Sequence, residues 1–307
     1  MIAGIKTTET RKPGKVPLHS SDTVKEFDFT RADFERVRTL IYRRAGISLA
    51  DSKHEMVYSR LARRLRATGI HSFGKYLDDL EAGRLGEEFE AFTNALTTNL
   101  TSFFREAHHF PLLAEHVQLL RGRDSAPLTI WCSASSTGEE PYSIAMTLCE
   151  AFNTLTPPVQ IIATDIDTNV LATAGDGMYG LDRVEKMSPE RLKRFFLRGK
   201  GRHEGMVRVR PELRQLVTFR QLNLLSDSWP LGGQNGAQFD AIFCRNVMIY
   251  FDKETQRKIL ARFVPLMKPH ALLFAGHSEN FLYVSDALRL RGKTVYELNA
   301  MRNERRA

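Results

Sequence analysis

The stretch Leu128-Thr-Ile-Trp-Cys-Ser-Ala-Ser-Ser-Thr-Gly-Glu-Glu-Pro141 decides the fold of this chain. A short apolar run, 128–132, passes through a turn of small residues into a helical pattern that covers 139–152. Small side chains between a strand and a helix let the backbone approach a ligand closely. The stretch therefore predicts the first strand, turn and helix of an α/β domain.

Further apolar runs follow in the chain, and helical patterns or long connections separate them. They cover residues 159–163, 216–219, 240–244 and 271–275. Continuous apolar strands that alternate with helices are typical of a parallel sheet buried on both faces. A final run, 294–298, follows a short connection and is expected to pair antiparallel. We expect a mostly parallel, Rossmann-like sheet domain over residues 123–300.

Residues 26–98 show helical periodicity and short loops instead of strands. Thr30 is a good N-cap for a helix that ends at Gly46, and a second helical pattern ends at Gly69. Two further helical patterns complete this part of the chain. The periodicity predicts a small all-α domain over residues 26–98.

Three segments stand apart from these two domains. Residues 1–25 are rich in Thr, Ser, Lys and Pro and are expected to be a disordered tail. Residues 99–122 are expected to be a linker. Residues 180–215 interrupt the alternation of strands and helices, and the runs 195–198 and 206–210 flank a glycine-rich turn. This pattern predicts a small inserted β-subdomain that contains a hairpin.

The charge of the chain suggests an acidic partner. Of 307 residues, 44 are Lys or Arg and 36 are Asp or Glu, so the formal net charge is +8. Between Arg31 and Arg66, ten Lys and Arg residues oppose four Asp and Glu residues. A local basic face of this kind fits a nucleic acid, a membrane surface or an acidic protein.

Other compositional features indicate a cytoplasmic protein without a metal site. No apolar run approaches the roughly 18–20 residues that span a bilayer, and the N-terminus lacks the pattern of a signal peptide. Cys132, Cys149 and Cys244 share no metal-ligand spacing and are expected to be small buried residues. His108 and His109 are expected on a helix surface rather than as a metal pair.

Polar side chains follow the predicted strands, at the edge where an open parallel sheet binds its ligands. The polar ones are Asp165, Asn223, Arg245, Asn246 and residues of the segment 276–280. The apolar Leu224 follows Asn223 at the same edge. An acid at the end of the second strand is the expected partner of two ribose hydroxyls. We therefore assign Asp165 to a ribose and leave the capping of the next helix to Asp167.

The choice of nucleoside cofactor depends on a missing motif. A dinucleotide site would require G-x-G-x-x-G after the first strand, and the sequence has no such motif there. S-adenosylmethionine carries no phosphate, and it needs an acid, a cation and an aromatic wall, which Asp165, Arg105 and Tyr250 can supply. A tyrosine face near a sulfonium contributes about 1 kcal/mol. The pattern favours a methyltransferase over a dehydrogenase.

These residues carry a resemblance to a known family, the chemotaxis receptor methyltransferases (CheR), over nearly all of residues 27–298. The matching motifs are Asn99-Leu-Thr-Ser-Phe-Phe-Arg-Glu106, Ser136-Thr-Gly-Glu-Glu-Pro-Tyr-Ser143, Asp165-Ile-Asp167, Cys244-Arg-Asn-Val-Met-Ile-Tyr-Phe251 and Gly276-His-Ser-Glu-Asn280. The resemblance implies an all-α domain joined to a class I methyltransferase domain. It also implies transfer of a methyl group from S-adenosylmethionine to glutamate side chains of chemotaxis receptors, with S-adenosylhomocysteine as the product.

The resemblance assigns roles to individual residues. It implies cofactor binding at Asn99, Thr101, Arg105, Glu140, Asp165, Asn223, Leu224, Arg245 and Asn246. It places the aromatic ring of Tyr250 near the methyl group. One departure is the turn Ser133-Ala-Ser135, where many members have Ala or Gly, although serine is also small.

The expected reaction requires no general base. A glutamate carboxylate has a reference pKa of about 4.3 and is already an anion at neutral pH. The enzyme then contributes mainly proximity and orientation. We expect Arg105 to clamp the methionyl carboxylate, and Arg245 and Tyr250 to orient the glutamate and the methyl donor.

Two surfaces are expected to bind the receptor substrate. The first is a basic helix, although a merely solvated face is the alternative; its residues are Lys53, Arg60, Arg63, Arg64 and Arg66. It would steer the acidic receptor coiled coil. The second is the inserted hairpin with Arg198-Gly199, which in the family binds a C-terminal receptor tail by strand addition. We expect a monomer that is recruited to membrane receptor arrays without inserting into the membrane.

Two other functions remain as alternatives. A nucleic-acid methyltransferase would fit the charge, but the Asn/Asp-Pro-Pro-aromatic motif is replaced by Arg245-Asn-Val-Met248. The tyrosines within the basic stretch that could stack on bases are limited to Tyr42 and Tyr58. A receptor adaptor that binds the cofactor without catalysis is the second alternative, and turnover would exclude it.

Overall fold

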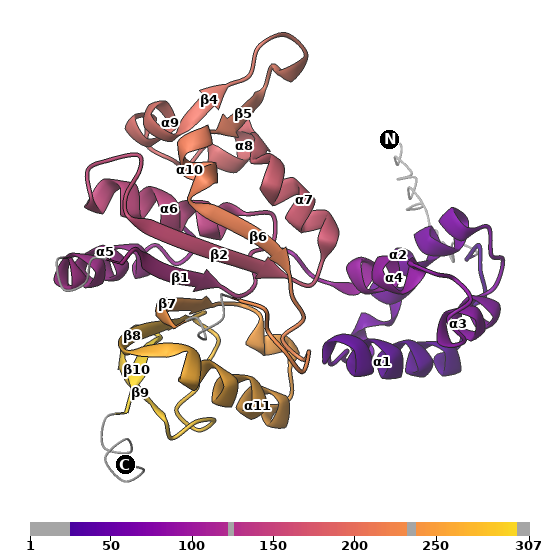
Figure 1. Cartoon of the computed structure of the whole chain (residues 1–307). Coiled ribbons are helices and arrows are strands. Elements are labelled where there is room, and N and C mark those ends of the chain that lie inside the picture. Colours follow the sequence, from indigo (N-terminus) through magenta and orange to yellow (C-terminus); the bar gives the residue numbers. More distant parts are fainter. Residues whose placement is uncertain (1–24, 122–125, 232–237, 300–307) are drawn as a thin grey trace, which may run out of the picture.

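The computed structural model describes residues 25–121, 126–231 and 238–299. The expected tail, 1–25, lies outside the described residues except for Lys25, whose Nζ lies 2.7 Å from the Glu55 carboxylate. The described chain forms a helical domain and a larger sheet domain, which lie side by side in Figure 1.

The helical domain contains four α-helices and one 3-10 turn within the described residues. They are α1 (Arg31–Ala45), η1 (Asp51–Lys53), α2 (His54–Thr68), α3 (Phe73–Glu81) and α4 (Glu88–Leu96). Thr30 begins α1 with a capping box, because its side chain accepts from Asp33 N and its own N donates to the Asp33 carboxylate. Gly46 and Gly69 end α1 and α2 with φ values of 70° and 69°, which confirms both predicted helix ends.

The sheet domain is built on seven strands in the order β6-β2-β1-β7-β8-β10-β9. They are β1 (Leu128–Cys132), β2 (Val159–Asp165), β6 (Val217–Gln221), β7 (Phe239–Cys244), β8 (Met267–Ala275), β9 (Leu288–Gly292) and β10 (Val295–Leu298). The strands from β6 to β8 run parallel, and β10 pairs antiparallel with β8 and β9. All predicted strands of this sheet are confirmed. The sequence pattern missed β9, because Leu288 alone is buried in this edge strand.

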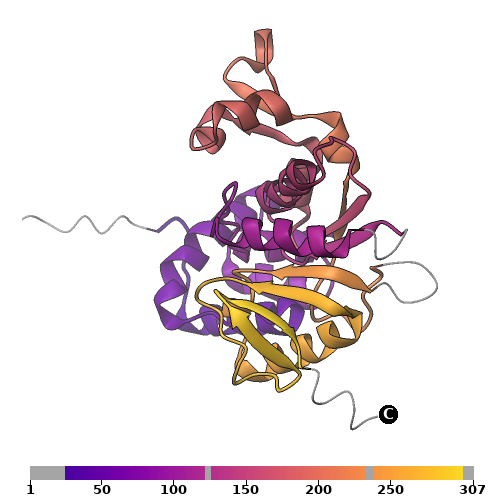
Figure 2. The ribbon, with the colours of Figure 1, turned by 90° about the vertical axis from the view of Figure 1, so that its left-hand side faces the viewer.

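Helices cover both faces of the sheet. They are α5 (His109–Leu120), α6 (Glu139–Ala151), α7 (Thr168–Asp176) and α11 (Lys253–Phe263), with the short turns η3 (Met248–Tyr250) and η4 (Val264–Leu266). Alternate strand residues point to opposite faces, so Ile130 packs in the core with α5 and α6 while Trp131 packs with α11. Figure 2 shows the magenta and gold helices on opposite sides of the sheet. None of the helices in the described ranges is long and apolar enough to cross a membrane.

The inserted subdomain projects from the sheet beyond α6 (Figure 1). Its elements are β3 (Met178–Gly180), α8 (Leu181–Val184), α9 (Pro189–Phe195), β4 (Phe196–Arg198), η2 (Gly201–His203), β5 (Met206–Val209) and α10 (Pro211–Gln215). The predicted hairpin of β4 and β5 is confirmed, and β3 adds a third antiparallel strand in the order β3-β5-β4.

The expected linker, 99–122, contains a helix that belongs to the sheet domain. Phe110, Leu113 and Val117 are buried on one side of α5, in the same core as α6 and the sheet. Their spacing of three and four residues is the helical signal that the linker interpretation overlooked.

Candidate active site

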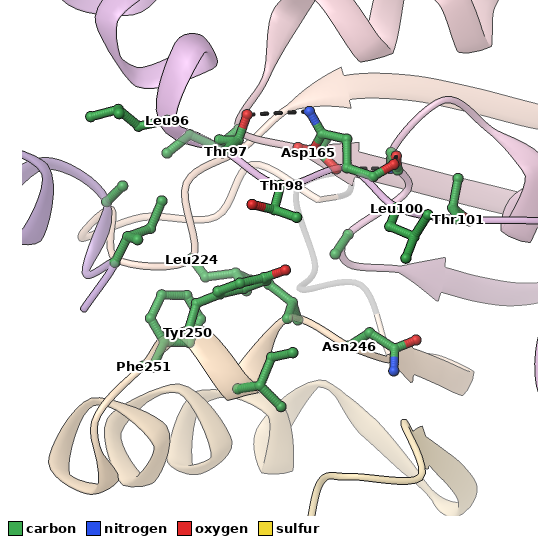
Figure 3. Close-up of a pocket in the computed structure, with 18 of the residues that line it drawn as sticks. Leu96, Thr97, Thr98, Leu100, Thr101, Asp165, Leu224, Asn246, Tyr250 and Phe251 are labelled. Atoms are coloured by element: carbon green, nitrogen blue, oxygen red, sulfur yellow. Dashed lines mark hydrogen bonds between the residues drawn. The ribbon is translucent and has the colours of Figure 1, made fainter. Parts of the chain in front are cut away.

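A cavity of about 390 Å³ lies between the helical domain and the carboxyl ends of the parallel strands. Its volume falls within the range of about 300–1,000 Å³ that small-molecule sites occupy. In Figure 3, Thr97, Leu100 and Asp165 lie along one side of the cavity, and Leu224 and Tyr250 lie along the other. The cavity is therefore at the edge where the sequence predicted a ligand.

The residues predicted to bind the cofactor all line this cavity. They are Asn99, Thr101, Arg105, Glu140, Asp165, Asn223, Leu224, Arg245 and Asn246. Tyr250, expected near the methyl group, and Lys53, expected at the substrate, line it as well. Because these residues come from segments far apart in the sequence, the fold brings them together.

Asp165 and Asp167 have separate roles at the end of β2. The Asp165 carboxylate accepts hydrogen bonds from Ser136 N at 2.8 Å and Asp167 N at 3.1 Å, and burial raises its pKa to about 6. Asp167 is the N-cap of α7 and accepts from Asn169 N at 2.9 Å. The predicted capping role of Asp167 is confirmed, and Asp165 is the acid that lines the cavity.

The turn after β1 brings the backbone close to the cavity. Ser133 and Ala134 of the turn that departs from the family line the cavity, and so does Ser136. Ser136 has a φ of 46°, in the left-handed region that L-residues seldom adopt. Gly138 has a φ of 97°, and a Cβ there would lie 2.8 Å from the Tyr179 hydroxyl. Such strained backbone is typical of ligand-binding loops.

The Arg245 side chain is fully buried, with 0% exposure, and protein groups hold it. Its Nη1 donates to the Glu140 carboxylate at 2.7 Å, and its Nη2 donates to the Arg105 carbonyl oxygen. The Glu106 carboxylate lies 3.4 Å from Nη2. The Nε has no hydrogen-bond partner among the described residues. Arg245 therefore ties the end of β7 to the segment before α5.

The two carboxylates beside Arg245 have opposite pKa shifts. Burial raises the pKa of Glu140, although the charge of Arg245 opposes this shift. Burial would also raise the pKa of Glu106, but hydrogen bonds from His277 and the charge of Arg245 outweigh it and lower the pKa to about 2. Glu106 is therefore an anion at neutral pH. Its Oε1 accepts from His277 N at 3.1 Å and from Asn246 Nδ2 at 3.3 Å.

Glu279 is a site residue whose role the sequence analysis missed. Its carboxylate accepts hydrogen bonds from the backbone nitrogens of Gly276, Asn246, Val247 and Met248, at distances of 2.6, 2.9, 3.0 and 2.7 Å. The bonds hold Asn246 in a left-handed conformation with a φ of 57°. No local pattern announced this role, because Glu279 lies four residues beyond the end of β8 and its donors come partly from the loop after β7.

Several predicted cofactor residues also make contacts within the protein. Arg105 Nη1 donates to the Leu100 carbonyl oxygen at 2.8 Å, and Asn99 Nδ2 donates to the Asp167 carboxylate at 2.8 Å. Asn223 Nδ2 donates to the carbonyl oxygen at the end of α1, that of Arg44, at 2.7 Å. The hydrogen bond from Asn223 joins the sheet domain to the helical domain.

The basic residues predicted to bind the substrate differ in whether their side chains are paired within the protein. Arg64 pairs with the buried Glu88 at 2.6 Å, Arg66 pairs with Glu26, and Arg60 donates to backbone carbonyl oxygens before the site. Lys53 and Arg63 are exposed, and their side chains form no ion pair or hydrogen bond with any described residue. Of the five residues, these two have no partner among the described residues, whereas Arg60, Arg64 and Arg66 make contacts within the protein.

The residues Arg198 and Gly199 lie where β4 ends and the turn of the hairpin begins. Arg198 is exposed at the end of β4. A Cβ at Gly199 would lie 2.0 Å from the His203 carbonyl oxygen, so the turn requires glycine. Gly199 N donates to Met206 O at 2.9 Å and closes the hairpin.

His109 does not lie on a helix surface, contrary to the expectation from the sequence. It is fully buried, and its Nε2 lies 3.0 Å from the Lys293 carbonyl oxygen. Burial lowers the pKa of His109 to about 4, so it is neutral at pH 7. The three cysteines are buried and unpaired, as expected. Within the described ranges, no three His, Cys, Asp or Glu residues are grouped to hold a metal ion.

Two family models match the chain, one over each domain. Residues 32–97 match the CheR methyltransferase all-alpha domain, and residues 99–296 match the CheR methyltransferase SAM binding domain. The "Chemotaxis protein methyltransferase" of Salmonella typhimurium is 56% identical over 268 residues, which cover 87% of this chain and 90% of that protein. The "Chemotaxis protein methyltransferase 2" of Pseudomonas aeruginosa is 56% identical over 274 residues, which cover 89% of this chain and 95% of that protein.

These matches agree with the geometry of the cavity. The sheet has the mostly parallel topology expected of a class I methyltransferase domain. The cavity is lined by an acid, Asp165, a cation, Arg105, and an aromatic residue, Tyr250. The chain belongs to the CheR methyltransferase family and is an S-adenosylmethionine-dependent methyltransferase.

Proposed function

We propose that this protein methylates glutamate side chains on the cytoplasmic helices of chemotaxis receptors and forms glutamate methyl esters. The proposal rests on one observation above all: the residues that suit the cofactor share a cavity with Lys53, a free cation from the helical domain. The relatives' name, chemotaxis protein methyltransferase, supports the same process.

The cavity suits a reaction in which the acceptor is already an anion. S-adenosylmethionine, when bound, supplies an electrophilic methyl group on its sulfonium. The Asp165 carboxylate would accept hydrogen bonds from the ribose hydroxyls, and Arg105 would pair with the methionyl carboxylate. The Tyr250 ring would supply the aromatic contact for the sulfonium. Glu140 and Glu106 hold Arg245 in place at the cavity wall.

The acceptor glutamate needs orientation rather than deprotonation. Its reference pKa of about 4.3 leaves it ionised at neutral pH, so no residue of this chain must remove a proton. The helical domain and the strand ends both line the cavity, and together they would hold the carboxylate in line with the methyl group. Orientation of this kind contributes several kcal/mol, about 7–11 in the best intramolecular cases.

Two surfaces, one beside the cavity and one on the inserted subdomain, would hold the receptor. Lys53 and Arg63 present free positive charge to an acidic helix beside the cavity. Residues 180–215 hold eleven Lys and Arg and five Asp and Glu, which is +6 of the net +8. Strand β4 lies at an edge of its sheet and can accept a receptor tail by strand addition. A tether of this kind raises the local concentration of the acceptor.

The test is transfer of radiolabelled methyl from S-adenosylmethionine to a purified receptor cytoplasmic fragment, followed by mild alkali. Release of the label as methanol would establish a carboxyl methyl ester. Label that resists alkali would indicate N-methylation, and label on added RNA would indicate a nucleic-acid substrate. Cofactor binding without any transfer would favour an adaptor.

A further inference from the structure

The inserted subdomain contacts the segment that leads from the cavity to α5. Arg183 on α8 donates a hydrogen bond from its Nη2 to the carbonyl oxygen of Thr101 at 3.1 Å. The ring of Phe103, two residues further along, packs against Tyr179 and Phe196 of the subdomain, with ring centroids 5.0 and 5.6 Å apart. Thr101 itself lines the cavity (Figure 3). A part of the cavity wall is therefore fastened to the inserted subdomain.

A buried carboxylate holds the side chain of Arg183 in place. The Nε of Arg183 donates to Glu139 Oε1 at 3.0 Å, and its Nη2 contacts the same oxygen. The Glu139 side chain is 0% exposed at the start of α6, and its Oε2 accepts from the Thr137 hydroxyl at 2.6 Å. Because a carboxylate held in this way fixes the plane of the guanidinium, the hydrogen bond to Thr101 has a defined direction. One side chain thus joins the first turn of α6 to the cavity wall.

Other hydrogen bonds hold the same segment before and after Thr101. Before it, the carbonyl oxygen of Asn99 accepts from Ser136 Oγ at 2.9 Å. After it, Phe104 N donates to Ser143 Oγ at 2.9 Å. Both of these partners belong to the turn after β1 or to α6, whereas the guanidinium that holds the Thr101 carbonyl comes from the inserted subdomain. The subdomain therefore helps to set the position of a residue in the cavity wall.

We infer that Arg183 is a positioning residue for the cofactor site and acts through the backbone of Thr101. Arg183 is not among the residues that line the cavity, so its effect is indirect. A site weakens when its supporting residues leave it about 1 Å too loose. The inserted subdomain is then part of the scaffold of the cofactor site, in addition to its proposed role in holding the receptor. The inference concerns cofactor affinity and does not depend on which group accepts the methyl.

The test separates the two bonds of the guanidinium. In Arg183→Lys, an ammonium can still pair with Glu139 but lacks the fork that also reaches Thr101. The calorimetric Kd for S-adenosylhomocysteine should rise about five- to tenfold. The thermal midpoint should fall by less than about 3 °C, because the buried carboxylate keeps its cation. The KM for S-adenosylmethionine should rise with the Kd, and kcat should stay near the wild-type value.

Arg194→Lys is the matched control within the same subdomain. Arg194 also joins the subdomain to α6, through a hydrogen bond from its Nη2 to the Cys149 carbonyl oxygen at 3.2 Å. That bond lies near the other end of α6, so the control variant should leave the Kd unchanged. Arg183→Met removes both bonds at once. It should weaken cofactor binding at least as much as Arg183→Lys and lower the thermal midpoint by several degrees, because Glu139 stays buried without its cation.

Three results would overturn the inference. The first is an unchanged Kd in Arg183→Lys, and the second is an equal rise of the Kd in Arg194→Lys. The third is a Kd that rises in Arg183→Met alone, because the ion pair with Glu139 would then account for the effect without the bond to Thr101. A failure of the enzyme to methylate a receptor fragment would contradict the proposed function and leave these binding measurements intact.

Discussion

The arginines at the carboxyl edge of the sheet and those on α2 are held in opposite ways. Arg245 is 0% exposed and lies between Glu140 and Glu106, whereas Arg63 on α2 is exposed and unpaired within the described residues. Breaking a buried ion pair costs about 3–5 kcal/mol, while exposed pairs contribute about 0–1 kcal/mol. The same residue type thus builds the cavity in one region and remains free to meet a partner in the other.

The largest effect is expected for Arg245→Met, which removes the buried charge at the cavity. Glu140 and Glu106 would then lose their shared cation, and the free energy of unfolding should fall by about 3–5 kcal/mol. Chemical denaturation measures this change. Arg63→Met is the matched control and should change stability by less than about 0.5 kcal/mol. A loss below about 1 kcal/mol for Arg245→Met would contradict the contrast between the regions.

Asp165→Asn is expected to weaken cofactor binding by about 1.5–3 kcal/mol, or roughly 10- to 150-fold, because it removes a charged acceptor. Burial raises the pKa of this carboxyl from 3.8 to about 6, so the wild-type group becomes neutral as the pH falls through 6. Wild-type affinity should therefore weaken below pH 6, and the Asn variant should lack that part of the pH dependence.

The raised pKa of Asp165 also affects stability. Because the folded state favours the neutral carboxyl, ionisation costs stability as the pH rises from about 4 through about 6. The free energy of unfolding of Asp165→Asn should not show this loss. Calorimetric titrations and denaturation curves between about pH 4 and 8 check both expectations. Identical pH profiles for the two proteins would rule out Asp165 as the titrating group.

The adjacent residues Arg63 and Arg64 on α2 allow the same comparison between an unpaired and a paired arginine. Arg64→Gln should lower the free energy of unfolding by about 1–3 kcal/mol, because it leaves the buried Glu88 without its cation. Arg63→Gln should leave stability unchanged and raise the KM for the receptor fragment about two- to fivefold, more at low salt. Equal effects of both variants on that KM would contradict the distinction between a structural Arg64 and a substrate-binding Arg63.

The smallest effect concerns the contact between the two domains. The Tyr42 hydroxyl donates to the Asp252 carboxylate, which also caps α11 through Thr255 N at 2.8 Å. Tyr42→Phe should lower the thermal midpoint only slightly, because the capping bond remains and Tyr42 is exposed. Tyr58→Phe is the control. A drop as large as that of Arg64→Gln would mean that this bond dominates the domain interface.

The sequence was most informative where local physics decides the structure. The helix ends at Gly46 and Gly69, the buried strands and the capping role of Asp167 all follow from short-range rules. The cavity residues could be named as well, because parallel strands place their carboxyl ends at one edge. Their motifs also resembled a known family, which supplied roles that spacing alone does not.

The remaining features depend on contacts between distant segments. Arg64 and Arg63 are adjacent in a basic run, and only the position of Glu88 decides which one is free. From the sequence His109 is expected on the surface, but in the structure it is buried against the turn at Lys293. In the sequence Glu279 is one polar loop residue among others, and only the structure shows that its carboxylate accepts hydrogen bonds from four backbone nitrogens. No local pattern contains this information.

The most direct measurement is tandem mass spectrometry of a receptor cytoplasmic fragment after incubation with the enzyme and S-adenosylmethionine. The account predicts methyl groups on glutamate side chains, lost after mild alkali and absent when those glutamates are replaced by glutamine. Methyl groups that survive alkali, or that map to lysine, would contradict it.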